Sequence, residues 1–523
     1  MTTNDQSTFD SLPPRAGWLA AGGEMALLWL VFYVVGGWPP PDPNEAHFLG
    51  KALHYWDPDW IRGDYFLDSS EPHFVFYALI GWLPRLVSLP TAAWIGRSLS
   101  WALIACAWQR LSSAVLPRGG WALLSGSLAV VLVERTQMAG EWLIGGFESK
   151  PIAYALVLFA LAQVVRDRWN RGWLLLGLAS LIHPVVGGWS VVATGLAWLL
   201  SGRMRPSLVS MWPGLLSGGL VALIGLIPML LSSRGIPSDI TQEGYRIYVF
   251  ERLAHHCLPQ TFAPRFLVAH GIALVVFFAL CRLTPFDRPL RIVRNVVIGS
   301  LLIALAGFGW AALASSHPEL AASVLRFYWF RLNDVLLPVG LALVGCVGLR
   351  RLLTVHRPWG VGCLALVLVG LSYELWPLAS ARLESPVPRA DGPGKIANYA
   401  DWVDVCGWIR ASAPHEARFL TPRSAQTFKW YAQRAEVATW KDMPQRADEL
   451  VEWRRRMYDV YGTGEPPPTP RFFPTLAEEG KSRLVELGRK YGARYVLTES
   501  QPSLDIERLY SNRTYSVYKL PAP

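Results

Sequence analysis

The stretch Trp212 to Leu231, WPGLLSGGLVALIGLIPMLL, holds no charged residue across 20 positions. A hydrocarbon core of about 30 Å is crossed by roughly 20 apolar residues in a helix, so this stretch predicts a membrane span. Outward from it, similar runs of spanning or near-spanning length start near Gly17, Ala92, Gly120, Pro151, Trp173, Val186, Pro264, Ile292, Leu332 and Trp359. The pattern predicts an α-helical polytopic membrane protein with about 11 transmembrane helices.

The composition agrees with a chain that lives in a bilayer. Of 523 residues, 52% are hydrophobic and only 17% are charged, which is too apolar for an ordinary soluble enzyme. The net charge of +10 comes from Lys and Arg scattered through short links, without the stripe or block that nucleic-acid binding needs. Most of the six cysteines sit in apolar runs, so no disulfide framework is indicated.

The basic links between the apolar runs predict the orientation. Arginines gather in the links at 110–118, 166–171, 203–205, 282–294 and 350–357. With Arg15 and the N-terminus inside, eleven spans place all five links on the cytoplasmic side of a bacterial inner membrane. This assignment requires that the run from Phe74 to Ser88, broken by Pro84 and Arg85, does not cross, and we expect an interfacial helix there.

Two features of the apolar part are less regular. The polar segment before Gly17 carries no basic n-region, and the first run is long enough to span, so we expect a retained first helix and not a cleaved signal. The stretch from Trp173 to Leu200 is interrupted at His183 and Pro184, which fits either two short helices or one kinked helix.

From about residue 382 the apolar runs stop, which predicts two regions: a membrane domain over 1–381 and a soluble α/β domain over 382–523 on the outer side. Strands are expected at 417–420, 436–440, 495–498 and 515–520, and helices at 401–411, 448–461 and 476–491. The link 462–474, with prolines at 466–468 and 470, is expected to be a stiff loop. The outer side also receives the long loops 38–91, 140–150 and 232–263, where function is sought first.

The first outer loop carries two carboxylates directly after the first apolar run. Asp42 and Glu45 at a membrane surface could supply a general base or hold a divalent cation. The alternative is that both cap the helix expected to begin near Asn44. The sequence leaves the cofactor unknown, with a divalent cation as the open candidate.

The plan of the chain resembles the GT-C superfamily of membrane glycosyltransferases. The shared features are a first helix, acidic residues in the first outer loop, interfacial helices, and Trp94-Ile95-Gly96-Arg97 opening the next span. In its short sequence motifs the chain is similar to an uncharacterised family of large bacterial polytopic membrane proteins. The motifs are Asn44-Glu45-x-His47, Gly146-Phe147-Glu148-Ser149-Lys150 and Arg326-Phe327-Tyr328-Trp329-Phe330-Arg331.

The resemblance implies a polyprenyl-phosphate-linked sugar as the partner molecule and a loop carboxylate as the base. Many GT-C enzymes carry adjacent Asp-Glu in this loop, whereas the adjacent pair here is Asn44-Glu45 and the nearest Asp is Asp42. The base is therefore expected to be Glu45 or Asp42. The expected substrate-binding residues are His47, Lys51, Asp64, His73, Arg97, Glu148, Lys150, His183, His255, His256, Arg326 and Arg331.

Several of these residues also have simpler interpretations. Glu148 and Lys150 could only pair with each other, and Arg326 and Arg331 could reach the headgroups instead of clamping a lipid phosphate. His255 and His256 lie beside Cys257, but adjacent histidines rarely share one ion, so no metal site is expected.

We expect sugar transfer from a polyprenyl-phosphate carrier to an acceptor on the outer face. The alternatives are a transporter or flippase of a lipid-linked substrate, and a non-catalytic envelope protein. An outer cavity that gathers Glu45, Glu148, His255 and Arg326 would favour the enzyme. The sequence does not set the oligomeric state.

Overall fold

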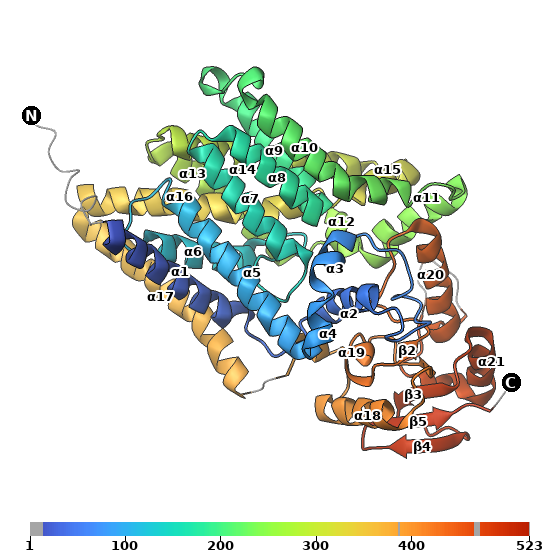
Figure 1. The fold of residues 1–523 in the computed structure, drawn as a ribbon. Coiled ribbons are helices and arrows are strands. Elements are labelled where there is room, and N and C mark those ends of the chain that lie inside the picture. Colours follow the sequence, from blue (N-terminus) through green and yellow to red (C-terminus); the bar gives the residue numbers. More distant parts are fainter. Residues whose placement is uncertain (1–13, 385–386, 465–470, 522–523) are drawn as a thin grey trace, which may run out of the picture.

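The computed structural model describes residues 14–384, 387–464 and 471–521. The prolines at 466–468 and 470, on which a stiff loop was expected, lie outside these described residues. Figure 1 shows a bundle of long helices beside a smaller region, coloured orange to red, that contains a sheet.

Each of the eleven apolar runs is a helix. They are α1 (Pro14–Gly36), α5 (Leu89–Ser112), α6 (Trp121–Thr136), α7 (Ser149–Val165), α8 (Trp169–Ile182), α9 (Pro184–Leu200), α10 (Leu208–Leu231), α13 (Pro264–Leu283), α14 (Arg288–Ala312), α16 (Arg331–Val355) and α17 (Arg357–Glu384). Among the described residues, six helices are long and apolar enough to cross a membrane, namely α1, α10, α13, α14, α16 and α17. These helices indicate a multi-pass membrane protein. The count of eleven spans is not confirmed, because α6 to α9 have only 14 to 17 residues and α5, although it has 24, is not among the six.

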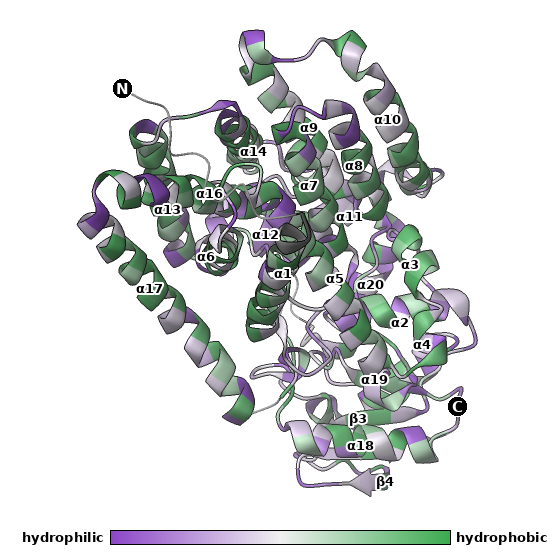
Figure 2. Cartoon of the chain, turned by 60° about the vertical axis from the view of Figure 1, so that its left-hand side comes forward, coloured by the Kyte–Doolittle hydropathy of each residue, from purple (hydrophilic) through white to green (hydrophobic). Residues whose placement is uncertain are grey.

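The long helices differ in how much of their apolar surface the protein itself covers. Only 6% of the most apolar window of α17 and 17% of that of α10 is buried, whereas 83% of that of α16 is buried. Hydrophobic residues run along the length of α10 and α17 in Figure 2. Large exposed side chains such as Trp359, Trp376 and Val209 would be costly in water, so these faces fit contact with lipid.

The interruption at His183 produces two helices and not one kinked helix. Pro184 cannot donate the backbone hydrogen bond that a continuous helix needs, and it occupies the first turn of α9. The His183 side chain instead accepts a hydrogen bond from the backbone N–H of Val186, at 3.3 Å, and so caps α9.

The connections on the side of the sheet are built from short helices. The loop 38–91 contains α2 (Glu45–Trp56), α3 (Phe74–Ile80) and α4 (Leu83–Leu86), and α3 with 7 residues is only about 10 Å long, too short to span. The interfacial helix expected over Phe74 to Ser88 is thus two short helices, and its place at the interface stays a prediction. The remaining short elements are η1 (Gly202–Met204), α11 (Ser238–Arg246), η2 (Ile247–Arg252), α12 (Ala254–Cys257), η3 (Pro259–Thr261) and α15 (Pro318–Leu325).

The C-terminal region contains a five-stranded mixed sheet in the order β2-β1-β3-β5-β4. Its elements are η4 (Arg389–Asp391), α18 (Tyr399–Ser412), β1 (Arg418–Leu420), α19 (Phe428–Ala432), β2 (Ala435–Glu436), α20 (Ala447–Tyr461), η5 (Leu476–Glu479), α21 (Gly480–Tyr491), β3 (Tyr495–Glu499), β4 (Glu507–Ser511) and β5 (Tyr515–Lys519). Strands β2, β1 and β3 are parallel, while β5 is antiparallel to both β3 and β4. The sequence did not predict β4 or α19, and the helix expected over 476–491 is divided between η5 and α21.

Both faces of this sheet are covered by helices. Phe419, Leu497 and Val517 pack with α18 and α19, whereas their neighbours Leu420, Val496 and Tyr518 pack with α20 and α21. Successive side chains of a strand point to opposite faces, so this alternation gives a three-layer arrangement.

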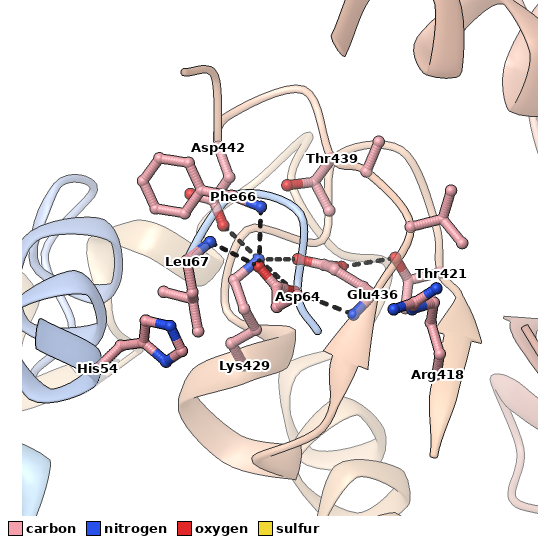
Figure 3. Close-up of polar contacts among 12 residues, drawn as sticks. His54, Asp64, Phe66, Leu67, Arg418, Thr421, Lys429, Glu436, Thr439 and Asp442 are labelled. Carbon is pink, nitrogen blue, oxygen red and sulfur yellow. Dashed lines mark hydrogen bonds and ion pairs between the residues drawn. The ribbon is translucent and has the colours of Figure 1, made fainter. Parts of the chain in front are cut away.

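The C-terminal region is joined to the loop 38–91 by a buried charged cluster around Lys429 (Figure 3). The Lys429 ammonium is paired with Glu436, lies 2.6 Å from Asp442 Oδ2 and lies 3.6 Å from Asp64 Oδ2. Asp64 also accepts the backbone N–H of Phe66 and, at 3.0 Å, that of Glu436. Buried charges are tolerated only when paired, so this cluster fixes the C-terminal region against the loop.

The orientation of the helices is open to a direct test. We expect alkaline phosphatase fused after Ser380 to be active and a fusion after Arg205 to be inactive, because the first position is predicted outside and the second inside. Enzyme activity in intact cells, normalised to fusion protein on a blot, measures this. The reverse pattern would contradict the predicted orientation.

Candidate functional site

A cavity of about 850 Å³ lies where the loops meet the C-terminal region. Nine of the fourteen site residues expected from the sequence line it: Asp42, His47, His73, Glu148, Lys150, His183, His256, Arg326 and Arg331. Further charged, polar and aromatic residues complete the wall, among them Asn44, Trp142, Tyr245, Tyr248, Arg252, Tyr328, Arg389 and Lys441. Five separate connections between helices and the C-terminal region thus contribute to one site.

Five expected residues do not line this cavity: Glu45, Lys51, Asp64, Arg97 and His255. Of the four residues whose gathering would favour an enzyme, the cavity therefore holds Glu148 and Arg326 but neither Glu45 nor His255.

Glu45 is buried in an ion pair with Arg97, and both side chains are fully inaccessible. Arg97 Nε donates to Glu45 Oε1 at 2.5 Å, and its terminal nitrogen binds Oε2. The backbone N–H of Phe147 donates to Oε1 at 2.7 Å, and that of Asp42 donates to Oε2 at 2.8 Å. Each oxygen thus has two donors, so Glu45 has no lone pair left for a substrate proton.

Asp42 differs from Glu45 in that only one of its two carboxylate oxygens accepts a hydrogen bond. Its Oδ2 accepts the backbone N–H of Gly146 at 2.8 Å. Its Oδ1 is buried and has no hydrogen-bond partner among the described residues. Burial raises the pKa of the Asp42 carboxyl above its usual range, while the nearby Arg389 charge acts in the opposite direction. Neither Asp42 nor the N-cap residue Asn44 caps α2 through its side chain.

The capping interpretation applies in part to Glu45. Its carboxylate reaches back to the backbone N–H of Asp42, as the acidic residue of a capping box does. This contact fixes the loop geometry that places Asp42 against Gly146.

Gly146 leaves no room for a larger residue behind Asp42. A Cβ at this position would lie 2.6 Å from Asp42 Cβ and 2.9 Å from Glu45 Cγ. We expect Gly146→Ala to displace the Asp42 carboxylate. Under the function proposed in the next subsection this should lower turnover by about 10²-fold, as an error near 1 Å in a reacting group does. The matched control is Gly188→Ala, where a Cβ meets nothing within 4 Å. Equal turnover in both variants, measured in the transfer assay described below, would contradict this role of Gly146.

A continuous polar chain crosses the cavity wall. It starts at Lys441 Nζ, which donates to Asn44 Oδ1 at 2.6 Å, and Asn44 Nδ2 donates to Glu148 Oε2 at 2.6 Å. Lys150 Nζ lies 3.4 Å from Glu148 and 3.1 Å from Glu141. The chain ends at Arg331, whose Nε lies 3.3 Å from Glu141 Oε2. Glu148 and Lys150 do pair, but each has a second partner.

The guanidinium of Arg326 lies against two aromatic rings. Its guanidinium carbon lies 3.9 Å from the ring centre of Tyr245 and 4.5 Å from that of Phe327. Its Nε donates to the backbone carbonyl of Ser323 at 3.2 Å, and no carboxylate pairs with it among the described residues. The terminal nitrogens of the fork are therefore available to an anion.

Burial favours the neutral form of two histidines of the cavity, His73 and His256. Burial lowers the pKa of His73 to about 4 and that of His256 well below its usual range, where the Arg331 charge adds to the effect. The ring nitrogen Nδ1 of His256 lies 2.6 Å from the carbonyl of Ala139 and must carry the proton, because a carbonyl only accepts. Its Nε2 is then an acceptor and is unsuited to hold a phosphate oxygen.

Lys51 and Asp64 have structural roles. The Lys51 ammonium is buried and donates to the carbonyls of Phe66 and Ser69, both at 2.7 Å, which closes the loop beneath the cavity. Asp64 belongs to the Lys429 cluster. Their prediction as substrate ligands rested on residue type in a polar loop, and the fold turns both side chains inward.

Sequence reasoning missed the residues Arg252, Arg389, Lys441 and Glu141. Arg252 directly precedes the histidine pair that was singled out, so the neighbouring motif offered a signal. Lys441 and Arg389 lie in the C-terminal region, more than 300 positions from the loop that they meet, and no local pattern marks them. Within the described ranges, no group of three or more His, Cys, Asp or Glu residues could hold a metal ion.

The fold and the cavity define a multi-pass membrane protein with a polar site against its C-terminal region. A family model described as "Domain of unknown function (DUF6798)" matches residues 400–460. No curated protein matches the chain.

Solved structures that resemble the fold include two of an oligosaccharyltransferase from the archaeon Archaeoglobus fulgidus. One is AglB in complex with an inhibitory peptide and a dolichol-phosphate, at 11% identity and a TM-score of 0.47, with 92% of this chain and 69% of that chain covered. The other is a complex with Zn and sulfate, at 13% identity and a TM-score of 0.40, with 90% and 67% covered. At this distance the likeness carries no statement about activity.

Proposed function

We propose that the protein is a membrane glycosyltransferase that moves a sugar from a polyprenyl-phosphate carrier to an acceptor hydroxyl. The observation that carries this proposal is a single cavity, at the ends of apolar helices, in which Asp42 offers an unpartnered oxygen and Arg326 offers an unpaired guanidinium fork. Glycosyl transfer needs these two functions, a base for the acceptor and a positive group for the leaving phosphate.

In this proposal Asp42 is the base, and not Glu45. Asp42 Oδ1 takes the proton of the acceptor hydroxyl. At the same time the hydroxyl oxygen of the acceptor attacks the anomeric carbon of the donor sugar. The bond between that carbon and the phosphate oxygen breaks, and the electron pair leaves with the phosphate. The raised pKa makes Asp42 a stronger base than an exposed aspartate.

The carrier phosphate is assigned to Arg326, with Arg331 contributing charge. Pro228, Met229 and Leu230 of α10 line the same cavity and give part of it an apolar wall. Such a wall suits the first isoprene units of a carrier. A guanidinium fork that is stacked on rings and short of acceptors suits its phosphate.

Transport of a lipid-linked substrate remains the alternative, and one buried network bears on it. His270 Nδ1 lies 2.8 Å from the Thr136 carbonyl, and Asn333 links His270 to Ser300 at 2.8 and 2.9 Å. Asp334 accepts the backbone N–H groups of Met138 and Ala139. Ionisable groups among apolar helices are functional candidates by default, but each of these has protein partners that account for its burial.

The test uses the full chain in lipid nanodiscs with a panel of radiolabelled polyprenyl-phosphate sugars and membrane extract as the source of acceptor. We expect label to move from the lipid phase to the acceptor with wild-type protein. A parallel assay in proteoliposomes follows the accessibility of a fluorescent lipid-linked sugar on each leaflet. Movement across the bilayer without sugar transfer would favour the transporter and contradict the proposal.

A further inference from the structure

The cavity has a second cluster of basic groups that the donor phosphate does not explain. It is formed by Arg252 and Lys441, which come from η2 and from the loop before α20. Arg252 Nε donates to the backbone carbonyl of Trp440 at 2.9 Å, and this bond places the guanidinium beside Lys441. The guanidinium also faces the Trp440 ring at 5.3 Å. Two segments almost 200 positions apart are thus joined at one spot of the cavity wall.

These two cations keep spare hydrogen-bond donors. Lys441 has three N–H groups and gives one to Asn44, while Arg252 has five and gives one to Trp440. No carboxylate forms an ion pair with either residue within the described part of the chain. The two nearest acids are engaged elsewhere, Asp442 by Lys429 and His47, and Glu148 by Asn44 and Lys150.

Holding these groups together without an anion is unfavourable. Burial, together with the positive charges of Arg252 and Lys395, lowers the pKa of Lys441 to about 8, although the carboxylates of Glu148 and Asp442 act in the opposite direction. Arg252, Lys441 and Lys395 also act together on His255, so the positive charges converge on one place. A bound oxyanion would relieve this repulsion and accept the spare N–H groups.

We propose that Arg252 and Lys441 bind an acidic group of the acceptor, so that the acceptor is a sugar carrying a carboxylate or a phosphate. This inference rests on the proposed function and adds the acceptor class to it. Asn44 lies next to Lys441 and two residues from Asp42, so an acid held there brings its own sugar ring toward the base. Arg326 contacts Tyr245 of α11 and has no part in the hydrogen bonds that tie Arg252 to Trp440 and Lys441 to Asn44, so we assign it to the carrier phosphate.

Binding to the full chain in nanodiscs tests this with defined probes, measured by titration calorimetry. The probes are trigalacturonate for a carboxylate, mannose 6-phosphate for a phosphate, neutral galactotriose as the reference, and polyprenyl phosphate for the carrier. We expect at least one acidic sugar to bind more tightly than galactotriose. Lys441→Gln and Arg252→Gln should each weaken that binding roughly tenfold or more, as loss of a charge-assisted bond does.

The two basic sites should separate in this experiment. Arg326→Gln should weaken the binding of polyprenyl phosphate and leave the binding of the acidic sugar unchanged. Arg455→Gln, an exposed arginine on α20 paired with Glu452, is the charge-matched control and should change neither. Whichever acidic probe binds identifies the carboxylate or the phosphate as the source.

The outcomes also separate this inference from the function on which it rests. Equal binding of neutral and acidic sugars, no binding of either acidic probe, or loss of acidic-sugar binding only in Arg326→Gln would overturn the acceptor site. Absence of polyprenyl-phosphate binding, with acidic-sugar binding that still needs Lys441, would overturn the donor assignment and support the anion site.

Discussion

Asp42→Asn is expected to lower sugar transfer by about 10² to 10⁴-fold, the range typical when a general base is removed. The change keeps the size of the side chain. It also keeps an oxygen that can accept the backbone N–H of Gly146, a bond now 2.8 Å long. Only the basicity of the free oxygen is lost. The rate is measured as label transferred per mole of protein, at saturating donor and acceptor.

The pH profile gives this prediction a second readout. A base must be deprotonated to act, so the wild-type rate should rise with pH as Asp42 ionises. The raised pKa moves this rise above the pH at which an exposed aspartate titrates. The residual rate of Asp42→Asn should lack the rise. If folded Asp42→Asn protein kept the wild-type turnover, or kept the same rise of the rate with pH, Asp42 would not be the base.

The sequence predicted the helices better than the site, because helices follow from local runs of residues whereas the site depends on contacts between distant segments. Apolar runs such as Trp212 to Leu231 are local, and each became a helix. The composition of a helix does not by itself show whether that helix crosses the membrane. The apolar helix α8, for example, has 14 residues and is short of the usual spanning length. In the C-terminal region β4 escaped prediction because its face is mostly exposed and carries no clear alternation.

The site depended on contacts between distant segments. The carboxylates at 42 and 45 were both visible in the sequence, but their roles were separated by Arg97, which lies 52 positions from Glu45. Nothing local shows that this arginine points at Glu45. Likewise, Asp64 was expected at a substrate and instead meets Lys429 of α19, an element that was not predicted. Glu148 and Lys150 belong to one short motif that is visible in the sequence, and both side chains line the cavity.

Removal of the Arg97 charge should strongly destabilise the protein. In Arg97→Met the Glu45 carboxylate stays fully buried and keeps its two backbone donors but loses its counter-charge. Breaking one half of a buried pair costs about 3–5 kcal/mol, which is a large share of the stability of a folded protein. We expect a marked fall in the midpoint of thermal unfolding, followed by tryptophan fluorescence in detergent, and a low yield of folded protein.

The double variant Glu45→Gln/Arg97→Met should recover much of this loss, because it buries no charge and the glutamine oxygen still accepts a backbone N–H. A double-mutant cycle should therefore give a coupling of more than about 1 kcal/mol between the two positions. The double variant also shows which of the two carboxylates, Asp42 or Glu45, acts as the base. Asp42 is intact in the double variant, and the oxygen of the glutamine can keep the backbone N–H bond of Asp42 that holds the loop. The folded double variant should therefore lose much less turnover than Asp42→Asn, whereas a base at Glu45 predicts the full 10² to 10⁴-fold loss. Additive destabilisation would contradict the structural pair, and folded but inactive double variant would return the role of base to Glu45.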